Sequence, residues 1–418
     1  MRSPVPDYLD EVADACTSAR DGAPAAYIPE LAKVDPDQFG VALATIDGEV
    51  YAVGDADVEF TIQSISKAFV YGLAVCDHGL DQVLEKIDVE PSGDPFDELS
   101  LDASGRPNNP MINAGALTAH SLVGDEGTSP GERVGRIIDL LSDLAGRELS
   151  VDEDVWRSEM DTADRNLAIA HMLRSHGILD DPAEEVVAAY ARQCSVLVTA
   201  RDLAVMAATL ANGGVQPVTG KRVFDRDQVR HVMSVMLTCG MYDSAGDWVS
   251  SVGIPAKSGV GGGIIGALPG QAGLATFAPP LDSHGNSVRG IEAFERLSRD
   301  MGMHLMDVAP PARSVIQSSR LVEHEGAEMR VYYLAGTIGF SGAELVVRRL
   351  TEHPPAQRRI ALDLTGVHSI NDVGRRMLLE AARRLRLDGH EVYLADADDV
   401  LPDPDPGDGD PLPLIPDL

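Results

Sequence analysis

The adjacent prolines Pro310-Pro311 are the feature that most restricts how this chain can fold. Proline fixes its own backbone angle and lacks a hydrogen-bond donor, so neither a helix nor a strand is expected to continue through the pair. At 418 residues the chain also exceeds one typical hydrophobic core. We therefore expect two domains, 1–306 and 314–398, followed by a disordered tail, 399–418, that is rich in Pro and Asp.

The segment after the prolines alternates between strand and helix patterns. Apolar residues typical of strands occupy 329–340, 358–367 and 390–397, and helical spacing is found in 342–352 and 374–389. Strands that alternate with helices predict a small α/β domain.

Composition limits the kinds of partner. The formal net charge of −32 repels phosphate groups and anionic lipids, so nucleic acid and membrane surfaces are not expected partners. The amino terminus shows no basic start followed by an apolar run, which argues against a secretory signal. No CxxC pair and no His cluster is present, so we expect no metal, no other cofactor and a cytoplasmic protein with the free thiols Cys16, Cys76, Cys194 and Cys239.

The sharpest local signal is Ser64-Ile65-Ser66-Lys67, followed by an apolar run. If a helix begins near Ser64, Ser64 and Lys67 share one face about 5–6 Å apart at Cβ. A serine hydroxyl attacks only when a neighbour removes its proton, and a buried lysine can do so in its neutral form. The ordinary explanation is an N-capping serine with a solvated lysine, because S-x-x-K alone is common.

A second motif, Lys257-Ser258-Gly259, follows far along the chain. Serine enzymes of the penicillin-recognising type pair S-x-x-K with a later K-[TS]-G strand. Such a strand lies beside the nucleophile and donates a backbone N–H to the oxyanion hole. A glycine-rich turn between strands is the structural alternative. The two motifs in this order favour the enzyme over that alternative.

At this point the first segment resembles a known family, the serine-dependent glutaminases. The motifs that carry the resemblance, over about residues 5–305, are AYIPELA, QSISKAFVYGLA, EPSGDPF, NNPMINAGAL, SEMDTADRNLAIAHML, ARQCSVLVTARDLAVMAATLANGGVQPVTG, LTCGMYDSAGDW and GIPAKSGVGGGI. The resemblance implies an α+β fold of the β-lactamase and penicillin-binding-protein kind, a mixed sheet flanked by helices with a helical subdomain.

The resemblance also implies roles for individual residues. Ser64 matches the family nucleophile and Lys67 its general base. Tyr242 matches the tyrosine that relays a proton to the leaving ammonia, and Tyr27 the tyrosine nearer the substrate. The backbone N–H groups at the positions of Ser64 and Val260 form the oxyanion hole. The remaining substrate-binding positions are matched by Asn113, Glu159, Asn166 and Tyr190.

These residue types suit L-glutamine. A carboxylate such as Glu159 can hold an α-ammonium, and the neutral donors can hold an α-carboxylate. The expected reaction is a two-step acyl transfer through Ser64 that yields L-glutamate and ammonia. Two alternatives stay open: a penicillin-recognising hydrolase, which shares both motifs, and a regulatory scaffold that senses glutamine without hydrolysing it. Family resemblance also implies a homo-oligomer, a dimer or tetramer.

The second segment resembles STAS domains through IALDLTGVHSINDVGRRMLLEAARRL. Signalling members carry a phosphorylatable serine at the start of the helix, where this chain has Asp372. A fixed carboxylate there is expected to hold the domain in one binding state for a protein partner. A plain helix cap is the alternative.

Overall fold

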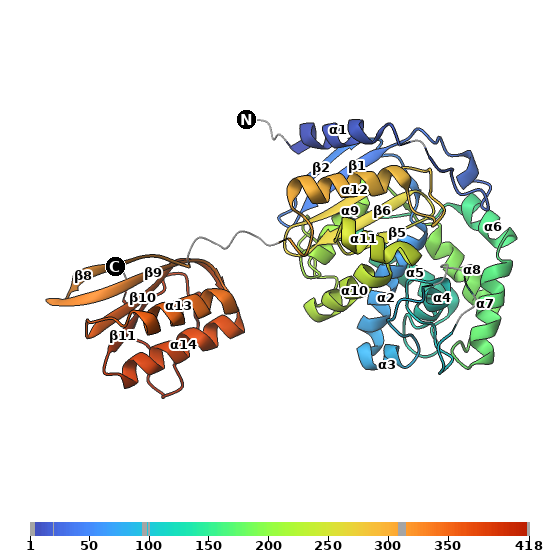
Figure 1. Cartoon of the computed structure of the whole chain (residues 1–418). Helices are drawn as coiled ribbons and strands as arrows, with labels where there is room; N and C mark the ends of the chain where they lie inside the picture. The colour runs from blue at the N-terminus through green and yellow to red at the C-terminus, as the bar shows by residue number, and fades with distance from the viewer. Residues whose placement is uncertain (1–4, 20, 94–97, 99–100, 308–314, 416–418) are drawn as a thin grey trace. The chain divides into compact units, whose positions relative to one another are not determined.

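The computed structural model describes residues 5–19, 21–93, 98, 101–307 and 315–415. The chain divides into two compact units, residues 1–307 and 308–418 (Figure 1). The division falls beside Pro310-Pro311, which lie outside the described residues. No helix in the described ranges combines the length and apolar composition that are needed to span a bilayer.

A five-stranded sheet forms the centre of the first unit, in the order β2-β1-β7-β6-β5. Every neighbouring pair runs antiparallel, so the expected mixed sheet is corrected to an antiparallel one. The reason is that turns too short for a crossover join β1 to β2, β5 to β6 and β6 to β7, and each turn reverses the chain. The bounds are β1 Gly40–Thr45, β2 Val50–Gly54, β5 Ala256–Ser258, β6 Gly263–Leu268 and β7 Ala272–Phe277.

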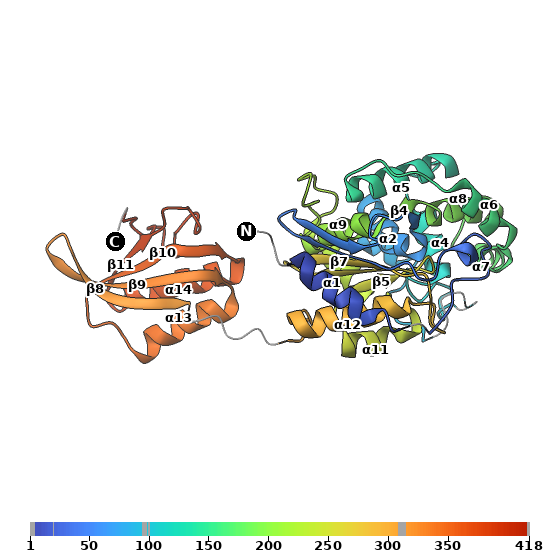
Figure 2. The ribbon, with the colours of Figure 1, turned by 90° about the horizontal axis from the view of Figure 1, so that it is seen from above.

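Side chains of this sheet alternate between two buried faces. Val41 packs in one core with α1 (Val5–Cys16) and α12 (Val288–Met301). Its neighbour Ala42 belongs to the other core, which contains α9 (Ala200–Ala211). Figure 2 shows α1 and α12 on one side of the sheet and α9 on the other. Because both faces are covered, β6 and β7 are buried at every position.

Among the helices of the first unit, α2 (Ser66–His78) is buried from Ser66 to Val75 and packs against several of the others. Local sequence fixes several of their ends: Ser129 and Glu132 form a capping box at the start of α5, and Gly146 ends it in the left-handed conformation. The remaining bounds are α3 Leu80–Leu84, α4 Asn113–Ser121, α5 Pro130–Ala145, α6 Glu153–Asp161, α7 Asp164–Ser175, α8 Ala183–Cys194, α10 Arg226–Cys239 and α11 Ala245–Ser251. The short strands β3 (Phe60–Thr61) and β4 (Leu197–Val198) pair with each other.

The second unit is a four-stranded sheet, in the order β11-β10-β9-β8, with two helices packed on one face. Strands β9, β10 and β11 are parallel and β8 is antiparallel to β9. The predicted strand and helix segments are confirmed, whereas β8 is an additional strand. The bounds are β8 Ile316–His324, β9 Ala327–Ile338, α13 Phe340–Glu352, β10 Arg359–Ile370, α14 Asp372–Leu387 and β11 Glu391–Ala395.

The segment after β11 corrects the expectation of a disordered tail, as far as residue 415. Leu414 bridges to Leu394 of β11 in parallel register, and the side chains of Leu412 and Ile415 are buried. Ile415 packs with Met329 on the sheet face opposite to the helices. Arg386 Nη1 donates to the backbone oxygen of Asp410 at 2.6 Å. The burial of Leu412 and Ile415 thus outweighs the Pro and Asp content of the segment.

Candidate active site

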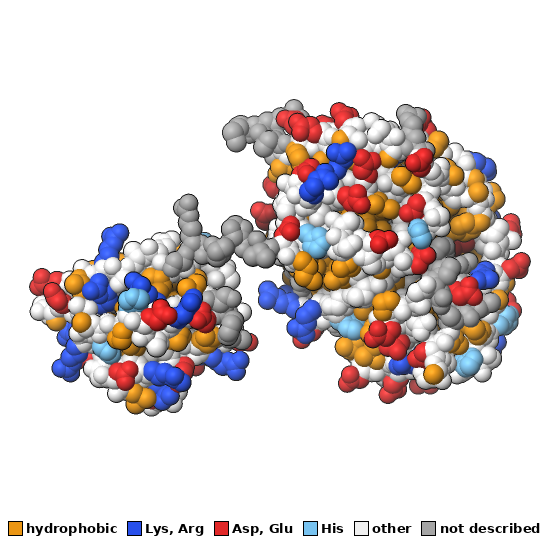
Figure 3. All heavy atoms as spheres, in the orientation of Figure 1, with side chains coloured by type: hydrophobic (Ala, Val, Ile, Leu, Met, Phe, Trp, Pro, Cys, Tyr) orange, Lys and Arg blue, Asp and Glu red, His pale blue; other side chains and the backbone are white. Residues whose placement is uncertain are grey.

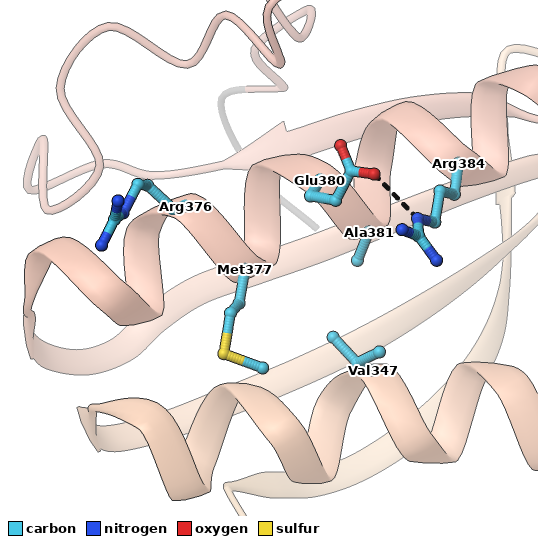
Figure 4. Close-up of a pocket in the computed structure, with 6 residues that line it drawn as sticks. All are labelled: Val347, Arg376, Met377, Glu380, Ala381 and Arg384. Carbon is cyan, nitrogen blue, oxygen red and sulfur yellow. Dashed lines mark hydrogen bonds and ion pairs between the residues drawn. The ribbon is translucent and has the colours of Figure 1, made fainter.

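Two hollows of similar volume are candidates for a functional site. The first lies between α13 and α14 in the second unit, with a volume of about 430 Å³. Figure 4 shows Met377 and Val347 pointing into it, and Glu380 pairs with Arg384 at 2.8 Å. It is lined by Val347, Arg376, Met377, Glu380, Ala381 and Arg384, so it has no nucleophile.

The second hollow, of about 440 Å³, lies in the first unit and collects most of the predicted site residues. Its lining includes a serine, a carboxylate, amides and phenols drawn from well-separated parts of the chain. The predicted residues that line it are Tyr27, Ser64, Asn113, Glu159, Asn166, Tyr190 and Val260. Lys67 and Tyr242 are not part of the lining, but both contact residues that are.

Ser64 lies in a 3₁₀ turn, Gln63–Ile65, that leads directly into α2. Its side chain is buried, with 7% of its surface exposed. The preceding residue, Gln63, has a left-handed backbone with φ of 49°, a conformation that non-glycine residues adopt at a cost and often at functional sites. The turn therefore presents Ser64 to the hollow from a constrained backbone.

The strand β5 carries the second motif and lies against this turn. A Cβ at Gly259 would stand 3.0 Å from the backbone oxygen of Ile62, so glycine lets the two segments approach closely without a tight contact. The backbone N–H groups of Ser64 and Val260 make no hydrogen bond to any residue within the described ranges. Two free amides beside the hydroxyl are the donors that an oxyanion hole needs.

Lys67 is buried, with 1% of its surface exposed. Its Nζ donates to Asn113 Oδ1 at 2.6 Å and to the backbone oxygen of Met111 at 3.3 Å. Asn113 Nδ2 in turn donates to Asn166 Oδ1 at 2.9 Å. The lysine is therefore held one turn after Ser64 by an amide that lines the hollow.

Lys257 is a second lysine with no exposed surface. Its Nζ donates to the backbone oxygens of Ser258 at 2.7 Å and Gly240 at 3.0 Å, and lies 3.9 Å from the centre of the Tyr242 ring. Burial, followed by the charge of Lys67, holds the pKa of Lys257 well below its usual range. The two ammonium charges thus disfavour each other inside the core.

Tyr242 lies in the 3₁₀ turn Tyr242–Ser244 and has a positive φ of 58°. Its hydroxyl donates to the backbone oxygen of Ser258 at 3.1 Å. Burial raises the pKa of Tyr242, and a hydrogen bond with the Ser64 side chain acts in the opposite direction. The phenol is therefore neutral and in direct contact with the Ser64 side chain.

Glu159 is the carboxylate of the hollow. Its Oε2 is buried and has no hydrogen-bond partner among the described residues. Burial raises the pKa of Glu159 to about 7, against the lowering effects of a hydrogen bond from Gln63 and the charge of Lys67. An unpaired buried carboxylate oxygen is a favourable place for a cationic group of a ligand.

Two phenols also line the hollow. Tyr190 on α8 is buried, and burial raises its pKa well above the usual range, so it is a neutral donor. Tyr27 lies in the loop before the 3₁₀ turn Leu31–Lys33 and is 52% exposed, which places it at the solvent side of the hollow.

Four lining residues were not predicted: Gln63, Thr162, Arg165 and Cys194. Cys194 is four residues after Tyr190 on α8, so helical spacing alone indicates that it faces the same way. Arg165 pairs with Glu98 at 3.2 Å at the rim. Apart from its position before Ser64, nothing in the sequence indicated that Gln63 lines the hollow. The left-handed backbone conformation of a glutamine cannot be predicted from sequence.

The start of α14 in the second unit has a conventional cap. Asn371 Oδ1 accepts from the backbone N–H of Gly374 at 2.8 Å. Asp372 is the first residue of the helix and is exposed.

Within the described part of the chain, no three His, Cys, Asp or Glu side chains are grouped so that they could hold a metal ion.

Comparisons with known proteins identify a family for each of the two units. The model of the glutaminase family matches residues 22–306 and that of the STAS domain matches residues 319–402. A glutaminase of Corynebacterium glutamicum is 47% identical over 403 residues, which cover 96% of this chain and 97% of the relative.

Two solved structures illustrate the similarity. The crystal structure of Mglu in its glutamate form has a TM-score of 0.86 and 46% identity, covering 96% of this chain and 100% of that one. A probable glutaminase from Bacillus subtilis, complexed with 6-diazo-5-oxo-L-norleucine, has a TM-score of 0.67 and 33% identity, covering 73% of this chain and 98% of that one. The chain belongs to the glutaminase family and carries a C-terminal STAS domain.

Proposed function

We propose that the chain hydrolyses L-glutamine to L-glutamate and ammonia, with Ser64 as the nucleophile. The observation that carries this proposal is the shared hollow of about 440 Å³, in which Ser64 and the unpaired carboxylate oxygen of Glu159 lie together. A serine that can be acylated and a site for an α-ammonium are the two groups that hydrolysis of an amino-acid amide requires.

The reaction has two steps. Lys67, as the neutral amine, takes the proton of Ser64 while Oγ forms a bond to the δ-carbon of glutamine. The C–N bond then breaks, and the nitrogen leaves as ammonia with a proton relayed through Tyr242. Water adds to the γ-glutamyl ester, releases glutamate and returns the proton to Ser64. The amides of Ser64 and Val260 stabilise the oxyanion in both steps.

The substrate α-groups are held at the other end of the hollow. Glu159 binds the α-ammonium, and Asn113, Asn166 and Tyr190 donate to the α-carboxylate. Tyr27 covers the solvent side. These contacts fix the δ-carbonyl at Ser64, so binding energy is used for orientation.

Ser64→Ala tests the proposal. We expect glutamine-dependent ammonia release to fall by at least about 1000-fold while glutamate still binds. Ser251→Ala, an exposed helical serine, is the matched control and keeps full activity. Wild-type ammonia release by the Ser64 variant would contradict the proposed nucleophile.

The same assay separates the two alternatives. A chromogenic β-lactam turned over by the wild type, with glutamine untouched, would identify a penicillin-recognising hydrolase. Saturable glutamine binding without ammonia would identify a sensing scaffold. The Glu159 carboxylate favours the glutaminase over the penicillin-recognising hydrolase, because glutamine offers it an α-ammonium. The Ser64–Lys67 pair favours the glutaminase over the sensing scaffold, which has no need of a nucleophile and a base.

The family assignment also suggests an assembly, and we propose a cytoplasmic homo-oligomer, a dimer or tetramer, in which the STAS domain binds a protein partner. Asp372 is exposed at the start of α14, where signalling STAS domains carry their phosphorylatable serine. Its carboxylate would place a permanent negative charge at that position. Analytical ultracentrifugation of the wild type and Asp372→Asn gives the oligomer size and any dependence on this charge. A monomeric wild type would contradict the proposed assembly.

A further inference from the structure

The left-handed backbone of Gln63 needs support, because an L side chain rarely adopts a φ of 49°. Gln63 immediately precedes Ser64, so any relaxation of its backbone moves the proposed nucleophile. We propose that Gln193 is a positioning residue for Ser64, which it holds through Ser66 and the backbone of Gln63. The inference rests on the proposed function, in which Ser64 is acylated.

Three hydrogen bonds connect Gln193 to this backbone and to α4. Ser66 Oγ donates to the backbone oxygen of Gln63 at 2.8 Å. Gln193 Nε2 donates to Ser66 Oγ at 2.9 Å. Gln193 Oε1 lies 2.8 Å from His120 Nδ1. The side chains of Ser66, Gln193 and His120 have no exposed surface, and Gln63 has 3%, so water cannot replace these partners.

The donor and acceptor of each of these three hydrogen bonds can be assigned in only one way. Ser66 has a single hydroxyl proton and gives it to Gln63, so it must accept from the Gln193 amide nitrogen. The Gln193 oxygen is then an acceptor, and His120 must carry its proton on Nδ1. Burial lowers the pKa of His120 to about 4, so the neutral ring with this tautomer persists at neutral pH.

Gln193 also joins the nucleophile turn to the substrate-binding helix. It lies on α8 three residues after Tyr190, which lines the hollow. The His120 ring meets the Tyr190 ring edge-on at 6.3 Å between centroids. These contacts therefore connect the turn that carries Ser64 to α8, the helix that carries Tyr190.

Gln193→Met tests the proposal, because methionine keeps the length of the side chain and removes both hydrogen bonds. We expect the rate of Ser64 acylation and kcat for glutamine to fall about 10- to 100-fold, while the Kd for glutamate changes by less than about threefold. Ser66→Ala breaks the same chain at its next member and should lower kcat similarly. The double variant should lose little more than either single one.

Thr209→Val is the matched control. Thr209 has no exposed surface, and its hydroxyl donates to the backbone oxygen of Val205 one turn earlier in α9, away from the hollow. It should lower the melting temperature without changing kcat. A merely structural role for Gln193 would give the same result as this control, and that outcome would overturn the proposal.

Other outcomes are equally decisive. An equal loss of kcat and of glutamate affinity in Gln193→Met would show general damage to the site and contradict positioning. If Gln193→Met does not fold, Ser66→Ala is sufficient to test the proposal. An unchanged kcat in Ser66→Ala would then contradict it. Failure of the proposed function is distinguishable, since it would appear as absent glutamine turnover in the wild type.

Discussion

The carboxylate of Glu159 is buried in a hollow whose other lining residues are neutral apart from Arg165 at the rim. One of its oxygens has no hydrogen-bond partner within the described ranges, so the folded protein without substrate favours the protonated acid. Substrate binding requires the ionised form, because the α-ammonium pairs with a carboxylate. Stability and recognition therefore make opposite demands on this residue.

The variant Glu159→Gln tests the effect of this carboxylate on stability and on substrate recognition. Because burial raises the folded pKa to about 7, the ionised side chain destabilises the fold increasingly between pH 4.5 and pH 7, by at most about 3 kcal/mol. The variant should therefore unfold at a higher temperature than the wild type at pH 8, with little difference at pH 4.5. Thermal unfolding at both pH values measures this, and exposed Glu148→Gln is the control.

The same variant changes the pH profile of activity. Wild-type kcat/KM for glutamine should fall as pH drops below about 7, since protonated Glu159 cannot pair with the α-ammonium. Glu159→Gln should raise KM strongly and remove that limb of the profile. An unchanged KM in the variant would place the α-ammonium elsewhere.

Among the structural elements, β7 and α9 pack unusually closely. A Cβ at Gly273 would stand 2.1 Å from the backbone nitrogen of Ala208 and 2.3 Å from the backbone oxygen of Ala204. The helix backbone itself thus lies on the sheet, which explains the alanine-rich sequence of α9. The helix side of this contact, Ala204 and Ala208, lies in the same core as α2.

Gly273→Ala should destabilise the protein by at least about 1–3 kcal/mol, because backbone atoms on α9 cannot move aside as a side chain can. Gly135→Ala in α5 is the opposite case, since a Cβ there meets nothing within 4 Å. It should stabilise the protein by about 0.5–1 kcal/mol through helix propensity. Urea unfolding of both variants checks the pair, and equal effects would contradict the packing argument.

The elements also show what sequence can predict. The second domain was largely predictable, because its strands and helices alternate within about 70 residues and each carries a clear apolar period. β8 escaped prediction because every one of its residues is exposed or half-buried. In the first domain, β1 pairs with β7, more than 200 residues later, and no local pattern reports such a pairing.

The residues of the site also differ in how far they could be predicted from the sequence. Ser64 and Lys67 follow from helical spacing, and Cys194 was predictable from Tyr190 by the same rule. Glu159, Asn166 and Tyr190 lie on three different helices, so only the family resemblance brought them together. The support that Gln193 gives to Gln63 depends on tertiary contacts and on a backbone angle, neither of which has a sequence signature.

On the scale of the whole molecule, charge is the dominant feature. The formal net charge is −32, and Figure 3 shows Asp and Glu side chains spread over the visible face of the first domain. Like charges repel in the compact state, and salt screens them. The surface should therefore make stability depend on ionic strength.

We expect the melting temperature to rise as NaCl increases from about 0.02 M to 1 M, because the screening length falls to about 3 Å at 1 M. Differential scanning calorimetry measures the rise, and a sucrose series of matched osmolality controls for solvent exclusion. A melting temperature independent of salt would show that the acidic residues are already neutralised by local pairs.

The C-terminal segment that pairs with Leu394 has a consequence for solubility. A strand at the edge of a sheet carries unpaired amides and carbonyls, on which another chain can add a strand. Residues 413–415 occupy part of that edge on β11. At the opposite edge, β8 is irregular between Ile316 and Ser318 and carries exposed charges. Both ends of the small sheet are thus protected against stacking into aggregates when the protein is stored or expressed at high concentration.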